Sequence, residues 1–195
     1  MNATHIAGEL LLAATTAVSL AWLWRSGRRA CAFGLSFVAG AALLGALEYA
    51  GAAAVSPMHA SATRWAAVAG FPAFAGFALW TQGHREPSWP IIAAVVLALG
   101  LIGRISPGPD YALAIGSLAL LCLLALAAFG WKATPRNSAL LFLACAVTAL
   151  AGLLIGTEGD WRSISRVDLY HLALASANLA YGRALRGITA SSYMR

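Results

Sequence analysis

The chain has 195 residues, of which 61% are hydrophobic and 10% are charged, and its mean hydropathy is +0.76. A soluble domain of this size needs far more charge on its surface, so this composition excludes an ordinary soluble protein. The formal net charge of +6 is not accompanied by a basic face or an RNA-type motif, so we expect no nucleic-acid partner.

The N-terminal apolar run carries Glu9 early and is followed, not preceded, by arginines. This charge order favours a retained first helix with its N-terminus outside over a cleaved signal peptide. Cys31, Cys122 and Cys145 lie in apolar runs without CxxC or metal-type spacing. We expect these isolated cysteines to be packing residues and not a disulfide framework.

A bilayer core about 30 Å thick needs roughly 20 apolar residues per helix. By this measure the chain is an all-α, polytopic integral membrane protein with about seven transmembrane helices in one domain, residues 1–195. The predicted spans are 6–24, 30–54, 64–81, 89–104, 110–131, 138–156 and 167–185. The connectors between them are short and rich in Gly, Pro and polar residues, and leave no room for a soluble domain.

Basic residues and tryptophans give the orientation. With the N-terminus outside, most of the 13 Lys+Arg fall on the cytoplasmic side, namely Arg25, Arg28, Arg29, Arg85, Lys132, Arg136, Arg183, Arg186 and Arg195. The tryptophans then fall at predicted interfaces, Trp65 and Trp161 at the outer one and Trp22, Trp24, Trp80, Trp89 and Trp131 at the inner one. Both patterns predict a multi-pass protein of the cell (inner) membrane with a cytoplasmic C-terminus.

Two spans have features that bear on packing. The second, "GLSFVAGAALLGALEYAGAAA", is dense in Gly and Ala, which predicts a central position with close helix contacts. The third contains Pro72 in mid-span, which predicts a kink. Such a kink marks a cavity in some proteins and is purely structural in others.

Four ionisable residues lie within predicted spans near the outer side. Glu9 is about one turn into the first span, Glu48 about a turn and a half from the outer end of the second, and Asp168 and His171 lie at the start of the last. A charge in a span normally faces the bundle interior and has a partner. The i,i+3 spacing puts Asp168 and His171 on one helix face, which Ala175 and Asn178 continue inward. We therefore expect the four to converge.

Three kinds of chemistry suit this set. Carboxylates and an imidazole can hold zinc or another divalent metal, which activates water for hydrolysis. An Asp–His pair can act as an oriented general base without metal. Buried carboxylates also serve proton or cation relays.

Structural roles are the alternative for each residue. Asp168 can be a helix-start residue favoured by the helix dipole, His171 an interhelical hydrogen-bonding residue, and Glu48 a structural one. We expect His5 and His59 to be interfacial loop residues, His84 a solvated inner-loop residue, and "TEGDWRSISR" a capped outer loop.

Several familiar motifs are missing. The sequence has no HExxH, HxxxH or GxSxG motif and no phosphate-binding glycine loop. Lys132, the one lysine, falls in a predicted inner loop, which excludes a retinal-type Schiff base within the spans. Of the histidines, we place only His171 within a span, which argues against bis-histidine haem ligation.

Seven helices, an outer polar cluster and the closing stretch "DLYHLALASANLAYGRAL" resemble the superfamily of seven-helix membrane hydrolases that contains alkaline ceramidases and progestin/adiponectin-receptor relatives. The resemblance implies a zinc site with three histidines that serves amide hydrolysis of a lipid. His171 matches the first histidine of the family's closing HxxxH, whereas Ala175 occupies the second position and the predicted third span has no histidine. Asp168 and Glu48 would then replace missing ligands.

The sequence thus leads to one main hypothesis and one rival. The main hypothesis is a metal-dependent hydrolase of a lipid or other amphipathic substrate in the bilayer, with Glu48, Asp168 and His171 as catalytic residues. In it His171, Asp168, Glu48 and Glu9 are the metal ligands. The rival is a non-catalytic membrane protein, namely a small-molecule binder, a transporter-like protein or an accessory subunit, in which the same cluster is a hydrogen-bond network.

Overall fold

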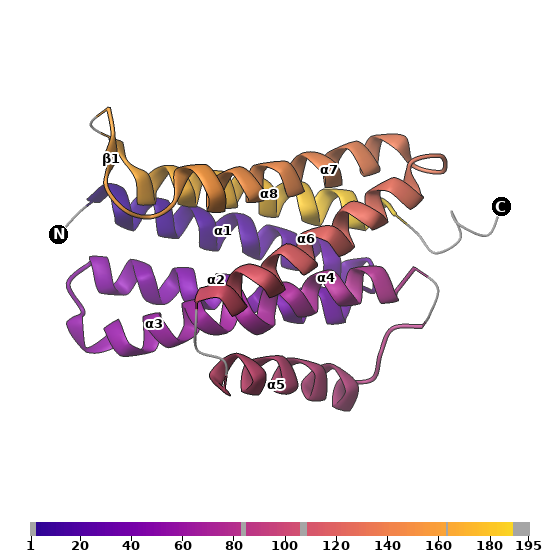
Figure 1. Cartoon of the computed structure of the whole chain (residues 1–195), viewed down its shortest axis with the longest axis horizontal. Coiled ribbons are helices and arrows are strands. Elements are labelled where there is room, and N and C mark those ends of the chain that lie inside the picture. The colour runs from indigo at the N-terminus through magenta and orange to yellow at the C-terminus, as the bar shows by residue number, and fades with distance from the viewer. Residues whose placement is uncertain (1–2, 83–84, 106–108, 163, 189–195) are drawn as a thin grey trace.

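The computed structural model describes residues 3–82, 85–105, 109–162 and 164–188. Nearly all of this chain is helical (Figure 1). The elements are α1 (Ala3–Arg25), α2 (Arg29–Tyr49), η1 (Ala53–Val55), α3 (Ser56–Trp65), η2 (Ala66–Gly70), α4 (Phe71–Trp80), α5 (Trp89–Ile105), α6 (Pro109–Gly130), α7 (Pro135–Leu150), η3 (Ala151–Ile155), β1 (Asp160–Trp161), β2 (Ile164–Ser165) and α8 (Arg166–Gly187). The predicted features at His84 and Arg195, and the side chain of Asp110, lie outside the described residues.

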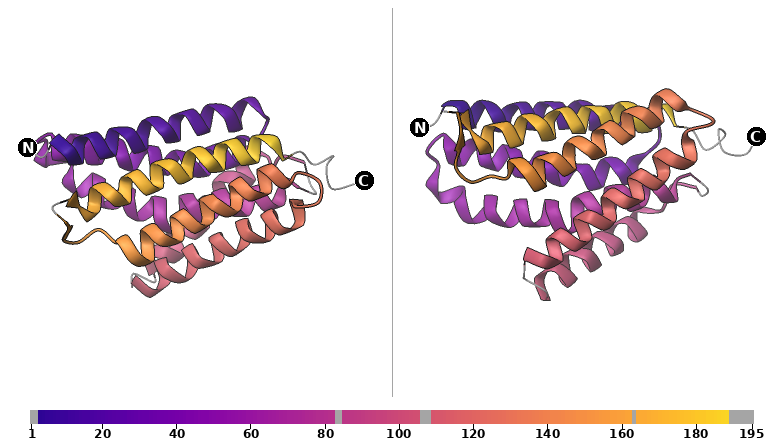
Figure 2. Two further views of the ribbon diagram at one scale, coloured as in Figure 1. Left: turned by 90° about the horizontal axis from the view of Figure 1, so that it is seen from above. Right: turned by 45° about the horizontal axis from the view of Figure 1, so that its top comes forward.

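The helices form a bundle of rods aligned roughly along the long axis of the molecule (Figures 1 and 2). Helix α1 packs between α2 and α8, α7 packs on α8, and α6 joins α7 to α4. Helix α5 lies at the edge of the bundle (Figure 1) and contacts mainly η2. The predicted all-α class is confirmed, with one small addition, the antiparallel pair of β1 and β2.

Four helical segments of the described chain are long and apolar enough to cross a bilayer. They are Ala3–Arg25, Arg29–Tyr49, Tyr111–Gly130 and Pro135–Ile155, and Trp89–Ile105 is a shorter apolar helix. The rod of α3, η2 and α4 begins with the polar stretch "SPMHASATRW", and α8 carries Asp168, His171, Asn178 and three arginines. Neither of these two rods is among the four segments.

Two predicted boundaries are wrong, and both errors lie in the loop between the second and third spans. Helix α2 ends at Tyr49, not at residue 54, and α3 begins at Ser56, not at residue 64. Gly51, with φ of +101°, turns the chain, because glycine adopts this backbone conformation without strain. Pro57 then stands in the first turn of α3, where its missing N–H costs nothing. Glu48 is therefore next to the end of its helix.

The expected irregularity at Pro72 takes the form of a π-helical turn. Residues Ala66–Gly70 form η2, and Pro72 stands in the first turn of the α4 segment that follows. Proline removes one backbone hydrogen bond and crowds the carbonyl four residues earlier, and a wider turn just before it relieves both effects. The rod from Ser56 to Trp80 runs on through this turn.

Helix α2 is central, as its Gly and Ala content predicts. It contacts α1, α3, α4, η2 and α5. A Cβ on Gly34 would lie 2.6 Å from the backbone nitrogen of Phe74 and 2.9 Å from the carbonyl oxygen of Gly70. Only glycine allows the two backbones to come this close.

The loop before α8 also differs from its prediction as a capped loop. Asp160 pairs with Ser165, and Trp161 with Ile164, in a two-stranded hairpin. Ser165 precedes α8 but makes no side-chain capping bond. The hairpin lies beside the start of α1, at the left in Figure 1.

The two ends of the bundle differ in charge, with Arg162 and Arg166 near the start of α8 and Glu86 just before α5 as exceptions. The start of α1, the end of α2 and the starts of α3 and α8 meet at one end, which we call the acidic end because it carries Glu9, Glu48 and Asp168. The other end, which we call the basic end, gathers basic residues at helix termini and connectors. They are Arg25, Arg28, Arg29, Arg85, Lys132, Arg136, Arg183 and Arg186.

Candidate functional site

An imidazole–carboxylate pair joins the first and last helices at the acidic end. The Nδ1 atom of His5 lies 2.6 Å from Oδ1 of Asp168, and both side chains are largely buried, with 16% and 17% of their surface exposed. The carboxylate fixes the orientation of the His5 ring and leaves its Nε2 for another partner. The expectation that His5 is a loop residue is wrong, because α1 already begins at Ala3.

A second such pair joins α2 to α3. The Nδ1 atom of His59 lies 2.5 Å from Oε2 of Glu48, and the Ser56 side chain also hydrogen-bonds Glu48. The expectation that His59 is a loop residue is wrong as well, because it lies in the second turn of α3. Consequently the third helical rod, where no histidine was expected, does supply one. The argument against bis-histidine haem ligation assumed that only His171 lies within a span. That assumption is wrong, since His5, His59 and His171 all lie on helices at this end.

Glu9 lies between these pairs and is only 2% exposed. Its Oε1 is 3.5 Å from Nε2 of His171 and 3.8 Å from Nε2 of His59. Gly45 of α2 makes room for it, because a Cβ there would overlap the Glu9 carboxylate and lie 3.0 Å from Nε2 of His59. Residue 45 must therefore remain a glycine for Glu9 to occupy this place.

His171 is a buried member of the cluster, with 8% of its surface exposed. Its Nδ1 is buried and has no hydrogen-bond partner, while its Nε2 faces Glu9. Such an unpaired nitrogen is uncommon in a buried side chain. Tyr49 closes the cluster, with its ring 5.0 Å from that of His5 and 6.5 Å from that of His59.

Glu9, Glu48, Asp168 and His171 lie together at the acidic end, where His5 and His59 join them. The two outer carboxylates, Glu48 and Asp168, are each used to orient a histidine. Within the described residues, no group of three or more His, Cys, Asp or Glu side chains is arranged so that it could hold a metal ion as it stands. The cluster is in this form a set of acid–base groups around a buried carboxylate.

The polar residues deeper in the last helix have a structural role. Asn178 donates from Nδ2 to Oγ1 of Thr16 at 2.8 Å, and Ser19 donates to the Asn178 carbonyl oxygen at 2.7 Å. The hydroxyls of Tyr181 and Thr148 are 2.9 Å apart. These bonds tie α8 to α1 and α7, and so hold His171 against Glu9 and Asp168 against His5.

Comparison of the chain with protein-family models, with curated proteins and with solved structures finds no match. The resemblance to seven-helix membrane hydrolases thus stays a prediction that depends on "DLYHLALASANLAYGRAL" and the helical plan alone.

Proposed function

We propose that this chain is an integral protein of the cell (inner) membrane with about seven spans, an outer N-terminus and a cytoplasmic C-terminus. We further propose that its acidic-end cluster is the catalytic site of a hydrolase acting on a lipid or other amphipathic substrate. The separation of basic from acidic helix ends supports the orientation, because positive charge is retained on the cytoplasmic side.

One arrangement supports a reactive site over a structural network. In the neutral tautomer whose Nδ1–H donates to the Glu48 carboxylate, the Nε2 of His59 presents a lone pair. That lone pair faces Oε1 of Glu9 at 3.8 Å, and Nε2 of His171 faces the same oxygen at 3.5 Å. Lone pairs on two nitrogens and a carboxylate oxygen repel one another when they are buried together. A positive centre between them, either a proton or a cation, removes this repulsion. In that tautomer, a proton or a bound cation shared by Glu9, His59 and His171 would supply this positive centre.

The spacing favours a divalent cation such as zinc as one form of this centre. Two ligands of a tetrahedral zinc ion, each about 2.0–2.1 Å from the metal, are about 3.3 Å apart. The two N–O distances exceed this value by a few tenths of an ångström. Because no described group is arranged to hold a metal as it stands, a cation form would require both imidazoles to move toward Glu9. Glu48 would then be the outer partner that orients a ligating histidine. A bound cation would supply an activated water.

The His5–Asp168 pair suits the proton transfers of hydrolysis. With its Nδ1 held by Asp168, His5 can accept a proton from water at Nε2 while the water oxygen adds to the carbonyl carbon of an ester or amide. The same nitrogen then returns the proton to the departing alkoxide or amine, and the carbonyl–heteroatom bond breaks. Atoms and charges balance without a further reactant.

Apolar side chains beside the site suit an amphipathic substrate. Next to Glu9, Glu48, His59 and His171 the chain exposes large apolar side chains, and Leu10, Leu47, Met58 and Leu172 are each about half exposed. A substrate with a polar head and an acyl tail can place its head in the cluster while its tail remains among these residues and the lipid.

The test is hydrolysis by purified protein in mixed micelles, with a panel of acyl amides and acyl esters and fatty-acid release as the readout. We expect wild type to cleave at least one of them, and Glu9→Gln to lower the rate by about 10²–10⁴-fold. Thr15→Ala is the matched control, because Thr15 is half-buried on the same helix and its side chain bonds only to carbonyls of that helix. No cleavage by wild type, or equal rates for wild type and Glu9→Gln, would refute the proposal.

Elemental analysis of protein prepared without chelator shows whether Glu9, His59 and His171 share a proton or bind a cation. Stoichiometric metal in wild type that is lost in His171→Ala supports the cation form. Wild type that lacks metal yet hydrolyses substrate contradicts the cation form and supports the shared proton.

A further inference from the structure

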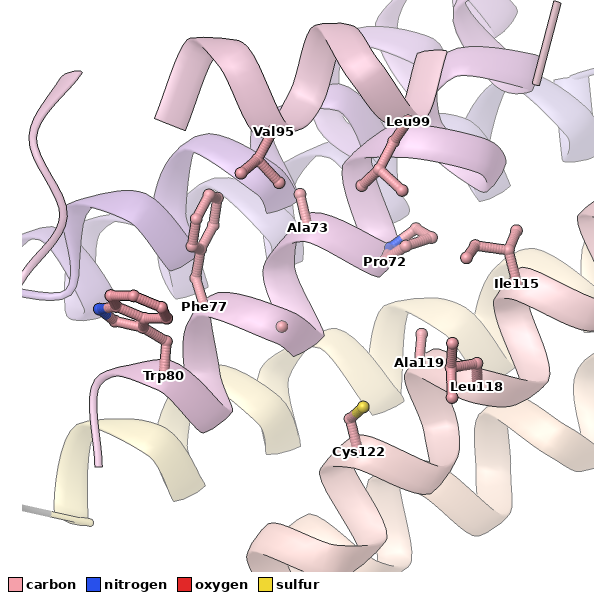
Figure 3. Close-up of a pocket in the computed structure, with 11 residues that line it drawn as sticks. Pro72, Ala73, Phe77, Trp80, Val95, Leu99, Ile115, Leu118, Ala119 and Cys122 are labelled. Carbon is pink, nitrogen blue, oxygen red and sulfur yellow. The ribbon is translucent and has the colours of Figure 1, made fainter. Parts of the chain in front are cut away.

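A groove outside the polar cluster opens between α4, α5 and α6 (Figure 3). Its cavity volume is about 330 Å³, and its walls are almost entirely apolar. Among the residues that line it are Ala73, Gly76, Phe77 and Trp80 of α4, Leu99 of α5, and Leu118 and Ala119 of α6.

Small residues keep this groove open. Gly76 has no atom within 4 Å of the place where a Cβ would stand, and Ala73 and Ala119 line the same space. Helix α5 approaches the bundle closely elsewhere, where Gly100 packs against the ring of Trp65. Near Gly76, α5 is held away from α4. The backbone arrangement therefore leaves a groove there that side chains do not fill.

The outside of the groove is apolar as well. Leu97 and Leu101 of α5 and Leu121 of α6 are more than half exposed, as is Leu118, which also lines the groove. In a membrane protein these side chains face hydrocarbon, so the medium that can enter the groove is an acyl chain and not water.

One exposed arginine, Arg85, lies near one end of the groove. Trp80 lines it at the basic end, and its Nε1 donates to the carbonyl oxygen of Arg85 at 3.3 Å. The Arg85 side chain is exposed. Its neighbour Glu86 accepts a hydrogen bond from the backbone N–H of Ala30, and the ion pairs among the described residues all lie at the acidic end. The charge of Arg85 therefore remains available to a ligand.

We propose that the groove binds an acyl chain of an anionic phospholipid, whose phosphate lies at Arg85. Apolar walls match the chain, and the exposed guanidinium matches the phosphate, which accepts two N–H bonds from one arginine. This site is separate from the acidic-end cluster, and its occupation does not depend on hydrolysis.

Native mass spectrometry of protein in micelles containing equal amounts of phosphatidylglycerol and phosphatidylcholine tests the proposal. We expect wild type to retain phosphatidylglycerol over phosphatidylcholine by about fivefold, the effect of one arginine near a lipid head. Arg85→Gln should remove this preference. Gly76→Leu places a side chain in the groove and should lower lipid occupancy by about tenfold, as expected from loss of contact with a few methylenes.

Gly40→Leu is the matched control, because Gly40 is exposed on α2, has open space at its Cβ position and does not line the groove. It should bind lipid as wild type does. Equal occupancy in Gly76→Leu and Gly40→Leu would overturn the acyl-chain site. Equal retention of the two phospholipids by wild type would overturn the role of Arg85. Thermal unfolding of each variant shows whether a loss of lipid reflects a loss of fold.

Discussion

Gly45→Ala is the substitution that most sharply separates the candidate site from the fold. Its Cβ would overlap the Glu9 carboxylate, with the carboxyl carbon at 2.6 Å, whereas ordinary contacts begin at 3.4 Å. The carboxylate must therefore retreat by more than about 0.8 Å, because its Oε1 lies closer still to that Cβ, and this exceeds the roughly 0.5 Å within which a catalytic group has to be held. The atom that moves is the end of a flexible side chain, so the backbone can stay where it is.

From this geometry we expect a large effect on the site and a small one on stability. Hydrolysis should fall by about 10²-fold, the cost of a misplacement near 1 Å, while the free energy of unfolding changes by no more than about 1 kcal/mol. Fatty-acid release and thermal unfolding in detergent measure the two quantities. In NMR spectra of protein with ¹⁵N-labelled histidine, the ring nitrogens of His59 and His171 should shift.

Two other glycines of α2 serve as controls. Gly40→Ala meets open space and should leave hydrolysis and the histidine spectra unchanged. Gly34→Ala meets the backbone of Phe74 at 2.6 Å, which cannot yield, and should lower the free energy of unfolding by about 1–3 kcal/mol. If Gly45→Ala behaves like Gly40→Ala in every measurement, the Glu9 carboxylate does not lie against Gly45 and the reasoning is refuted.

Three further predictions concern the framework and the orientation. Asn178→Ala removes the bond to Thr16 and should lower the free energy of unfolding by about 0.6–1.7 kcal/mol, measured by thermal unfolding. Arg28→Lys should cost about 1.5–3 kcal/mol, because the buried guanidinium bonds both the Thr81 hydroxyl, at 2.8 Å, and the carbonyl oxygen of Ile188. In intact cells, a cysteine at Gly159 in the hairpin should react with an impermeant maleimide, whereas one at Ser26 should react only after permeabilisation.

The controls for these predictions lie close to the changed residues. Ser176 is exposed on α8 and bonds only within its own helix, so Ser176→Ala should leave stability unchanged. Arg25 is exposed, so Arg25→Lys should do the same. A drop in stability for either control as large as for its partner would contradict the assigned bonds. Labelling of Ser26→Cys in intact cells would reverse the predicted orientation.

Hydropathy predicts the helical rods well, because apolar length alone determines most of them. It also indicates that Glu9, Glu48, Asp168 and His171 share a depth, and they do meet. Hydropathy fails at "SPMHASATRW", because this part of the helix is polar. A search for apolar runs therefore places the start of the third helix eight residues too late. The signal that could have corrected this is Ser-Pro, a common helix start.

The two missed histidines follow from these helix starts. With α3 beginning at Ser56, His59 lies on a helix beside Glu48. His5 and Glu9 are spaced i,i+4, which already places them on one face of α1. No sequence pattern shows that Gly45 makes room for Glu9, because that contact depends on how closely α1 and α2 approach. The hairpin of Asp160–Trp161 and Ile164–Ser165 is likewise too short for a periodicity to reveal.

The most direct test of the central claim is the rate of fatty-acid release by wild type and by His5→Gln in the same proteoliposomes. His5 is the decisive residue, because its Nδ1 is held by Asp168 and its Nε2 performs the proposed proton transfers. We predict measurable release by wild type and a loss of about 10²–10⁴-fold in His5→Gln, with thermal unfolding unchanged within about 1 kcal/mol. Equal rates for the two proteins, or no release by wild type, would contradict a catalytic site at the acidic end.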